Sequence, residues 1–186
     1  MNSDLYILST NPDEIILKRL TYSTDPDTIH YGLADFLAQQ EMDRYCGYWW
    51  DPNSNGIAFV KVDESNIPVY RIMYQTDTNL NAQCTHQNKN DNYEDHRYPF
   101  AGKENLKITL GHINLKSTNN WNDNITWLQS PPEANEYLTR VHFISSTSNK
   151  HLIAQWQNRL QNLLLMVRYD LLDGSYQVSS FIIVDS

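Results

Sequence analysis

Cationic side chains are scarce in this sequence of 186 residues, which has 14 Lys and Arg against 22 Asp and Glu and a formal charge of −8. Nucleic acids and anionic membrane surfaces are bound by clustered Lys and Arg. The charge balance therefore argues against both as partners. No apolar run reaches the roughly 18 residues expected of a helix that spans a bilayer, so we expect no membrane span.

Cysteine is also rare, with only Cys46 and Cys84. They could form a disulfide, but an isolated pair is more often two free thiols, which leaves the compartment unknown. The start of the chain, Met1 to Ile7, lacks the basic residues and apolar core of a signal peptide. Cys84 with His86 and His96 offers one thiolate and two imidazoles, whereas structural zinc takes four ligands at defined spacing. We expect no metal site.

Glycine is limited to six residues, and none of them forms a phosphate-cradling loop or a dinucleotide-binding motif. We therefore expect no cofactor. The hydrophobic fraction of 40%, with twelve Tyr and five Trp, indicates a packed globular protein and not a disordered chain. The length suits one ordinary domain.

One stretch of the sequence combines a helical segment, two strands and a tight turn. Ala38 to Tyr45 is polar and helix-prone, Tyr48 to Trp50 is aromatic, and Ile57 to Val62 is rich in β-branched residues. Aromatic and β-branched side chains are typical of strands. Between the two strands, Pro52 supplies a fixed φ and Gly56 a permissive one, as a tight turn requires.

The rest of the sequence reads mostly as strands separated by turns and polar loops. Further strands are predicted over Leu5 to Leu8, Ile15 to Leu20, Pro68 to Tyr74, Leu106 to Leu110, His112 to Leu115, Tyr137 to Phe143, His151 to Trp156, Leu163 to Tyr169 and Tyr176 to Val184. Gln75 to Asp95 and Ser117 to Asn135 are predicted as polar excursions. The alternative for Leu160 to Tyr169 is a helix, but the Asp173-Gly174 turn and the strand after it favour a hairpin.

Repeated hairpins indicate the fold class. Leu163 to Val184 has the same strand-turn-strand layout as Leu5 to Leu20, and periods of roughly 40–50 residues in an all-β sequence are typical of propeller blades. We predict an all-β chain, an incomplete β-propeller of about two to two and a half four-stranded blades, with one short helix near residues 38–45. Because a propeller typically closes with about 4–8 blades, we expect that this chain does not close a ring by itself.

The expected organisation divides the chain into parts of three blades. Residues 1–21 form the end of one blade, and residues 30–115 form a second blade with an inserted loop over 75–95. Residues 116–186 form an arm and a third blade. Strand edges left unpaired by an incomplete ring are prone to aggregate.

Several separated stretches follow one another in a specific order and spacing, namely Gln40 to Arg44, Gly47 to Pro52, Ile57 to Phe59, Val62 to Val69, Arg97 to Gly102 with Asn105, Tyr137 to Val141, and Gln155 to Asn162. Together they resemble the N-terminal β-propeller of the dipeptidyl peptidase IV family of serine peptidases (family S9B), its bacterial members in particular. The resemblance implies a propeller that gates access to a hydrolase domain. Gln75 to Asp95 is longer than the family pattern and resembles an insertion.

The resemblance also implies a site for the substrate's N-terminus. In the family, two adjacent glutamates on a short helical segment hold the peptide's free α-ammonium, and the register of Met42-Asp43-Arg44 places this pair on Gln40 and Glu41. Carboxylates accept charge-assisted hydrogen bonds from an ammonium, and a substrate without that group would leave both anions unpaired and so be rejected. Gln40 departs from the pattern, since an amide accepts a hydrogen bond but brings no charge. Without the resemblance, Gln40 and Glu41 are a solvated helix face, and Asp43 with Arg44 is a salt bridge that holds the helix.

Catalysis in the family belongs to a separate α/β-hydrolase domain with a Ser–Asp–His triad, whose serine lies on a Gly-x-Ser-x-Gly elbow. No glycine of this sequence frames a serine in that way. We therefore expect no catalytic residue here and no peptidase activity from this chain alone. Its expected partners are a peptide N-terminus in an intact enzyme and a complementing chain with the remaining blades and the hydrolase domain. Family members are often periplasmic or extracellular.

An interface arm is a further expectation from the resemblance, over Thr109 to Tyr137. This stretch contains Trp121 and Trp127, and exposed aromatic side chains are enriched at interfaces. Self-association through these residues is the resulting hypothesis. Two other hypotheses for the whole chain remain: a non-catalytic interaction module, and a truncated gene product that has lost its function.

Overall fold

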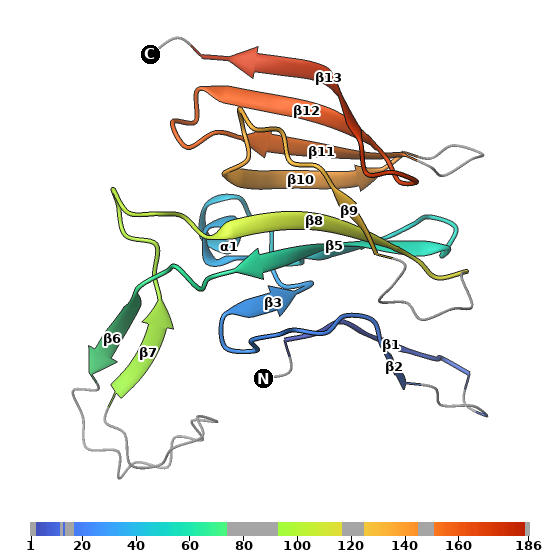
Figure 1. Ribbon diagram of the computed structural model, residues 1–186, viewed down its shortest axis with the longest axis horizontal. Coiled ribbons are helices and arrows are strands. Elements are labelled where there is room, and N and C mark those ends of the chain that lie inside the picture. The colour runs from blue at the N-terminus through green and yellow to red at the C-terminus, as the bar shows by residue number, and fades with distance from the viewer. Residues whose placement is uncertain are drawn as a thin grey trace. The chain divides into compact units, whose positions relative to one another are not determined.

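The computed structural model describes residues 3–11, 13, 17–73, 93–116, 125–144 and 151–184. They form a mostly β structure with one short helix (Figure 1). In this described part, no helix is both long enough and apolar enough to cross a membrane. The chain divides into two compact units, Met1–Ser65 with Lys107–Ser186, and Asn66–Leu106.

A five-stranded antiparallel sheet is the first layer of the larger unit (Figure 1). Its strands are β3 (Ile29–Tyr31), β4 (Tyr48–Trp50), β5 (Gly56–Asp63), β8 (Lys107–Asn114) and β9 (Ile125–Leu128). We call it the first sheet. β5 and β8 lie in its middle and are its most buried strands, with Phe59, Val60 and Leu110 fully buried. The ring of Phe59 contacts that of Trp127 on β9, with centroids 5.8 Å apart.

β3 and β4 are two halves of one edge strand. β3 pairs with Lys61 to Asp63 of β5, and β4 pairs with Ile57 to Phe59 of the same strand. Val60 lies between these two halves and bonds to both, because Gly32 N donates to Val60 O at 2.8 Å and Val60 N donates to Gly47 O at 2.8 Å. Residues 32–47 therefore leave the edge strand and return to it opposite a single residue of β5.

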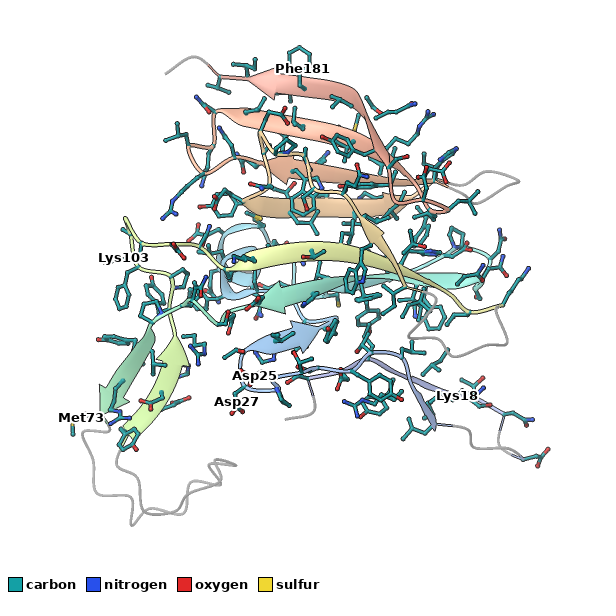
Figure 2. All side chains as sticks on the ribbon, in the orientation of Figure 1. Lys18, Asp25, Asp27, Met73, Lys103 and Phe181 are labelled. Atoms are coloured by element: carbon teal, nitrogen blue, oxygen red, sulfur yellow. The ribbon has the colours of Figure 1, made fainter. Side chains whose placement is uncertain are left out.

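A four-stranded antiparallel sheet, the second sheet, follows in chain order (Figure 1). Its strands are β10 (Tyr137–Phe143), β11 (His151–Gln157), β12 (Leu163–Asp170) and β13 (Tyr176–Ile183). Buried and half-buried side chains alternate along β11, as expected for a strand with one face in the core. The fully buried Trp156 donates its Nε1–H to the hydroxyl of Tyr169 at 2.9 Å. β13 is exposed along most of its length, including Phe181 (Figure 2).

A short N-terminal hairpin, β1 (Tyr6–Leu8) and β2 (Leu17–Arg19), completes the larger unit. Its base is held by the Asp4 carboxylate, which pairs with Arg19 and accepts from the Thr21 hydroxyl and the Ser23 backbone N–H. Leu20 is fully buried and belongs to the same core as Phe59. The hairpin is therefore packed onto the first sheet.

The smaller unit contains one hairpin, β6 (Val69–Met73) and β7 (Tyr93–Arg97). Every residue of β6 is exposed, including Met73 at its end (Figure 2). Across the hairpin, Arg71 and Asp95 form two hydrogen bonds of 2.7 Å. The ring of Phe100 packs edge-on against those of Tyr70 and Tyr98.

The predicted all-β class with one short helix is confirmed, and so are most of the predicted strands. The helix alternative for Leu160 to Tyr169 is wrong, since β12 begins at Leu163. The two predicted strands Leu106 to Leu110 and His112 to Leu115 are one strand, β8, which Gly111 does not interrupt.

Two predicted polar excursions contain strands. β7 begins at Tyr93, inside the predicted loop Gln75 to Asp95, whose residues up to 92 lie outside the described part. β9 lies inside Ser117 to Asn135 and pairs with β8 of the first sheet. Both strands are short, and each is defined by its pairing with a neighbouring strand, β6 for β7 and β8 for β9. The blade boundaries at residues 21, 30 and 115 stay a prediction.

Candidate functional site

Residues 32–47, which interrupt the edge strand, form the excursion that carries the candidate site. Its two ends are joined by an isolated antiparallel bridge between Leu33 and Cys46 and by a hydrogen bond of 3.2 Å from Gly47 N to Gly32 O. Gly47 has no room for a side chain, since a Cβ there would lie 2.5 Å from Leu33 O. The excursion is thus closed at its base, where it joins the edge of the first sheet.

The helix of the excursion is α1 (Phe36–Glu41). Asp35 caps its N-terminus by accepting a hydrogen bond from Ala38 N at 2.9 Å, as N-cap carboxylates do. The helix ends because Asp43 adopts a left-handed conformation with φ of 50°. The chain then turns back, and Ala38 O accepts from Arg44 N at 3.0 Å. The helix therefore starts two residues before the predicted segment 38–45 and ends within it.

Gln40 and Glu41 occupy the last turn of α1, and both are exposed. In the described part of the chain, the Glu41 carboxylate makes no ion pair. The neighbouring Gln39 side chain points back into the excursion and donates to Ala34 O at 2.8 Å. Of these three polar side chains, Gln40 and Glu41 are the two accessible from solvent, as a site for an external ligand requires.

Arg44 forms the main interaction beneath the helix, and its partner is Asp35 and not the predicted Asp43. Its Nη2 lies 3.1 Å from Asp35 Oδ2, and the side chains of Arg44 and Asp35 are 7% and 4% exposed. Nη1 donates to Cys46 O at 3.3 Å, and the guanidinium lies 5.9 Å from the Trp49 ring centroid. Sequence reasoning missed this pair because Asp35 and Arg44 stand nine residues apart, beyond the spacing of a helical ion pair.

Burial of Arg44 also affects its pKa. Burial lowers the pKa below its usual value, the charge of Asp35 opposes that effect, and the charge of Arg140 on β10 lowers it further. Arg44 Nε is buried and has no hydrogen-bond partner in the described residues. A buried cation of this kind depends on its carboxylate partner.

The excursion and the strand after it, β4, carry four exposed aromatic side chains. Phe36, Tyr45, Tyr48 and Trp50 are exposed by 43%, 66%, 43% and 47%. Alternation along β4 puts Tyr48 and Trp50 on one face and Trp49 on the other, where it is half-buried. Trp50 is therefore exposed, and only Trp49 is turned toward the buried side of the strand.

One serine, one histidine and one carboxylate do come together elsewhere. His30 Nδ1 lies 3.1 Å from Ser3 Oγ, and His30 Nε2 lies 3.8 Å from Glu64 Oε2. However, Ser3 is 3% exposed and its hydroxyl donates to Pro26 O at 2.7 Å. Its oxygen therefore accepts from Nδ1–H, so that the histidine is not placed to remove the hydroxyl proton. This cluster ties the N-terminus to β3 and is no nucleophile.

The other residues that the sequence singled out lie only partly within the described part of the chain. Trp127 lies on β9 and Thr109 to Asn114 lie on β8, so these parts of the predicted arm are strands of the first sheet. Trp121 lies outside the described residues, as do Cys84 and His86. Cys46 carries a free, exposed thiol. Over the ranges that the structure describes, no three His, Cys, Asp or Glu side chains gather as metal ligands.

A family model and the curated relatives of this chain point to the same family. The family model described as "Dipeptidyl peptidase IV (DPP IV) N-terminal region" matches residues 1–182. Dipeptidyl peptidase 4 of Bos taurus is 26% identical over 171 residues, which cover 89% of this chain and 20% of the bovine protein. Inactive dipeptidyl peptidase 10 of Mus musculus is 27% identical over 153 residues, which cover 80% of this chain and 17% of the mouse protein. The chain thus spans about a fifth of the length of these curated relatives.

A solved structure shows the same fold. Porphyromonas gingivalis dipeptidyl peptidase 4 superposes with a TM-score of 0.78 at 20% sequence identity, over 100% of this chain and 24% of that one. At this identity the likeness concerns the fold alone. The predicted resemblance is confirmed, and the β-sheets match part of a dipeptidyl peptidase 4 propeller.

Proposed function

The chain belongs to the family of dipeptidyl peptidase IV N-terminal regions, and from this we propose that it forms part of a substrate-recognition propeller that binds the free N-terminus of a peptide. In this proposal the Glu41 carboxylate accepts charge-assisted hydrogen bonds from the peptide's α-ammonium. Gln40 adds a neutral acceptor beside it. The observation that carries the proposal is the Glu41 carboxylate, which is exposed beside the exposed Gln40 in the last turn of α1 and makes no ion pair in the described part of the chain.

Replacement of the first acid by Gln40 makes this site weaker than one with two carboxylates. A hydrogen bond to a charged group stabilises by about 1.5–3 kcal/mol, against about 1 kcal/mol for a neutral pair. We therefore propose binding of free N-termini through one strong and one weak acceptor. Discrimination against blocked N-termini then depends on Glu41 alone.

Peptide hydrolysis needs groups that this sequence does not supply, because it contains no Gly-x-Ser-x-Gly elbow. We propose that the dipeptide-releasing activity arises when the chain acts together with polypeptide that carries the remaining blades and a hydrolase domain. In that assembly, the propeller gates access and anchors the substrate N-terminus. The residues of this chain then select the substrate without touching the scissile bond.

The test is complementation. The chain is purified alone and together with a polypeptide that encodes the remaining blades and the hydrolase domain, and the release of an X-Pro dipeptide from a chromogenic substrate is measured. Activity is expected only in the mixture, and Glu41→Ala should raise KM by about tenfold or more, as loss of a charged hydrogen bond predicts. Glu133→Ala, on a loop distant in sequence from α1, is the matched control. A stable complex without any activity contradicts the peptidase role.

A second candidate function is a non-catalytic peptide-binding module. Two observations favour it: Gln40 at the first acid position, and similarity to a relative whose own name is inactive dipeptidyl peptidase 10. A module of this kind binds a peptide with a free N-terminus but remains without activity in every complementation mixture. Gln40→Glu separates the two candidates further, since restoring the second carboxylate should strengthen amine binding in both but create no hydrolysis in the module.

Self-association is a separate proposal, which rests on Trp121 and Trp127. Trp127 is 41% exposed, but its ring also packs against Phe59 inside the first sheet. Trp121→Ala is therefore the cleaner test. Sedimentation velocity should show a weaker dimer for this variant, and an unchanged sedimentation coefficient distribution rules out this surface.

A further inference from the structure

The cation closest in sequence to Glu41 is Arg44, only three residues away. Arginine pairs readily with carboxylates and presents five donors in a fork. A mobile Arg44 side chain would therefore compete with any ligand ammonium for Glu41. In the structure it does not, because its guanidinium is turned under the helix and is 7% exposed.

Asp35 is the group that draws Arg44 under the helix. One oxygen of its carboxylate caps α1 through Ala38 N at 2.9 Å, and the other accepts from Arg44 Nη2 at 3.1 Å. The left-handed turn at Asp43 lets the backbone reverse so that Arg44 reaches Asp35. One carboxylate thus caps the start of the helix and holds the cation that follows its end.

We propose that Asp35 sequesters Arg44 and so keeps the Glu41 carboxylate available to a ligand ammonium. Asp35 and Arg44 are positioning residues, because neither contacts the ligand. This inference rests on the proposed function of Glu41. It adds that amine binding requires an intramolecular competitor to be held away, and not only a carboxylate at the right place.

The experiment separates the charge of Asp35 from its capping role. Asn caps a helix about as well as Asp, so Asp35→Asn keeps the cap and removes the charge that holds Arg44. The double variant Asp35→Asn/Arg44→Met then also removes the competitor. Replacing both partners of a buried pair by groups without charge is often tolerated. Asp95→Asn and Asp95→Asn/Arg71→Met are the matched controls at an exposed ion pair of the same chain.

Two readouts are measured on each variant. The first is the affinity for a tetrapeptide with a free N-terminus, divided by that for its N-acetylated form, from NMR titrations of the chain. The second, which needs no ligand, is the amide hydrogen exchange of Arg44, whose N–H is bonded to Ala38 O. We expect Asp35→Asn to reduce the affinity ratio by about tenfold and the double variant to restore it to within about threefold. Exchange at Arg44 should accelerate in Asp35→Asn, and the controls should match the wild type.

Each outcome decides one of the two claims. If the wild-type chain binds both peptides equally, the proposed function of Glu41 fails, and the exchange of the Arg44 amide alone decides the anchoring by Asp35. If the wild type discriminates and Asp35→Asn discriminates as well, the inference is wrong and the proposed function stands. A double variant as weak as Asp35→Asn also overturns the inference, since Asp35 would then act through the fold and not through Arg44.

Discussion

The two sheets of the larger unit share one strand order but differ at one point of their first strand. In the second sheet, Tyr137 and Leu138 pair with Gln157 and Trp156, and then Thr139 bulges out before Arg140 resumes pairing with Gln155. In the first sheet, β3 pairs with the end of β5, and the chain then leaves the strand for residues 32–47 before β4 resumes. The same place in the strand order holds one extra residue in one sheet and the candidate site in the other.

The difference shows what an insertion needs in order to be ordered. One extra residue is accommodated by a β-bulge, which only bends the strand locally. The excursion is too long for that and requires interactions of its own, which the buried pair of Asp35 and Arg44 supplies. A second insertion, between β5 and β8, contains β6 and β7, and its ion pair of Arg71 and Asp95 is exposed by 54% and 37%. Predictions about these elements test how far the comparison holds.

The largest effect is expected when the excursion loses its buried cation. Arg44→Met leaves the Asp35 carboxylate buried without its partner, and breaking a buried pair in this way lowers the free energy of unfolding by about 3–5 kcal/mol. Arg71→Met, at the exposed pair, should have little effect because water screens that interaction. Urea unfolding of both variants measures the difference. Equal losses would show that the excursion is not held by its own pair.

A smaller loss is expected where the second sheet meets the edge of the first. Gly174, in the β12–β13 turn, has φ of 76°, and a Cβ there would lie 2.2 Å from Trp127 O on β9. Gly174→Ala should cost about 2–4 kcal/mol, from the left-handed backbone and the clash together. Gly102→Ala is the control, since Gly102 has the same φ but no atom within 4 Å of its Cβ. Equal shifts in the thermal unfolding midpoint would mean that the two sheets are not in tight contact there.

The pH dependence of stability tests another contact between the sheets. His112 of β8 packs against Phe143 of β10, and burial lowers its pKa from 6.5 to about 4, an effect that Asp51 partly offsets. The unfolded chain therefore binds a proton at a higher pH than the folded chain. Stability should be full above about pH 6.5 and should fall by up to about 3 kcal/mol as the pH is lowered to about 4. Urea unfolding of His112→Leu between these pH values should show a shallower fall, and parallel curves would contradict the assignment.

The smallest effect is expected inside the second sheet, where no insertion has to be ordered. Tyr169→Phe removes the acceptor of the Trp156 Nε1–H, and a buried donor without a partner costs about 1–2 kcal/mol. Tyr176→Phe is the matched control, because this half-buried tyrosine contacts Tyr169 only through its ring. Urea unfolding followed by Trp fluorescence compares the two. Equal values would show that the hydrogen bond contributes no net stability.

Much of the fold follows from local patterns in the sequence. β4 has the predicted bounds Tyr48–Trp50, and β10 has the predicted bounds Tyr137–Phe143. These strands combine aromatic or β-branched residues with clear flanking turns. β7 and β9 were missed because they are short and lie in stretches that are polar as a whole, and each is defined by its pairing with another strand.

The candidate site divides in the same way. The order of residues around Met42-Asp43-Arg44 identified Gln40 and Glu41, and the structure places both on an exposed helical turn. The sequence did not identify Asp35. Its carboxylate caps the helix through Ala38, three residues away, and pairs with Arg44, nine residues away, which reaches it only after the chain reverses at Asp43.

By itself, the sequence determined the β class, most strand positions and the family resemblance, since these depend on the local composition and order of residues; Gln40 and Glu41 as the site stay a prediction from that resemblance. Only the tertiary structure decided that β3 and β4 are one interrupted strand and that Arg44 lies under the helix with Asp35. The physical reason is the same for both. Pairing across a sheet and burial of an ion pair are long-range interactions, and their partners are chosen by the packing of the whole unit.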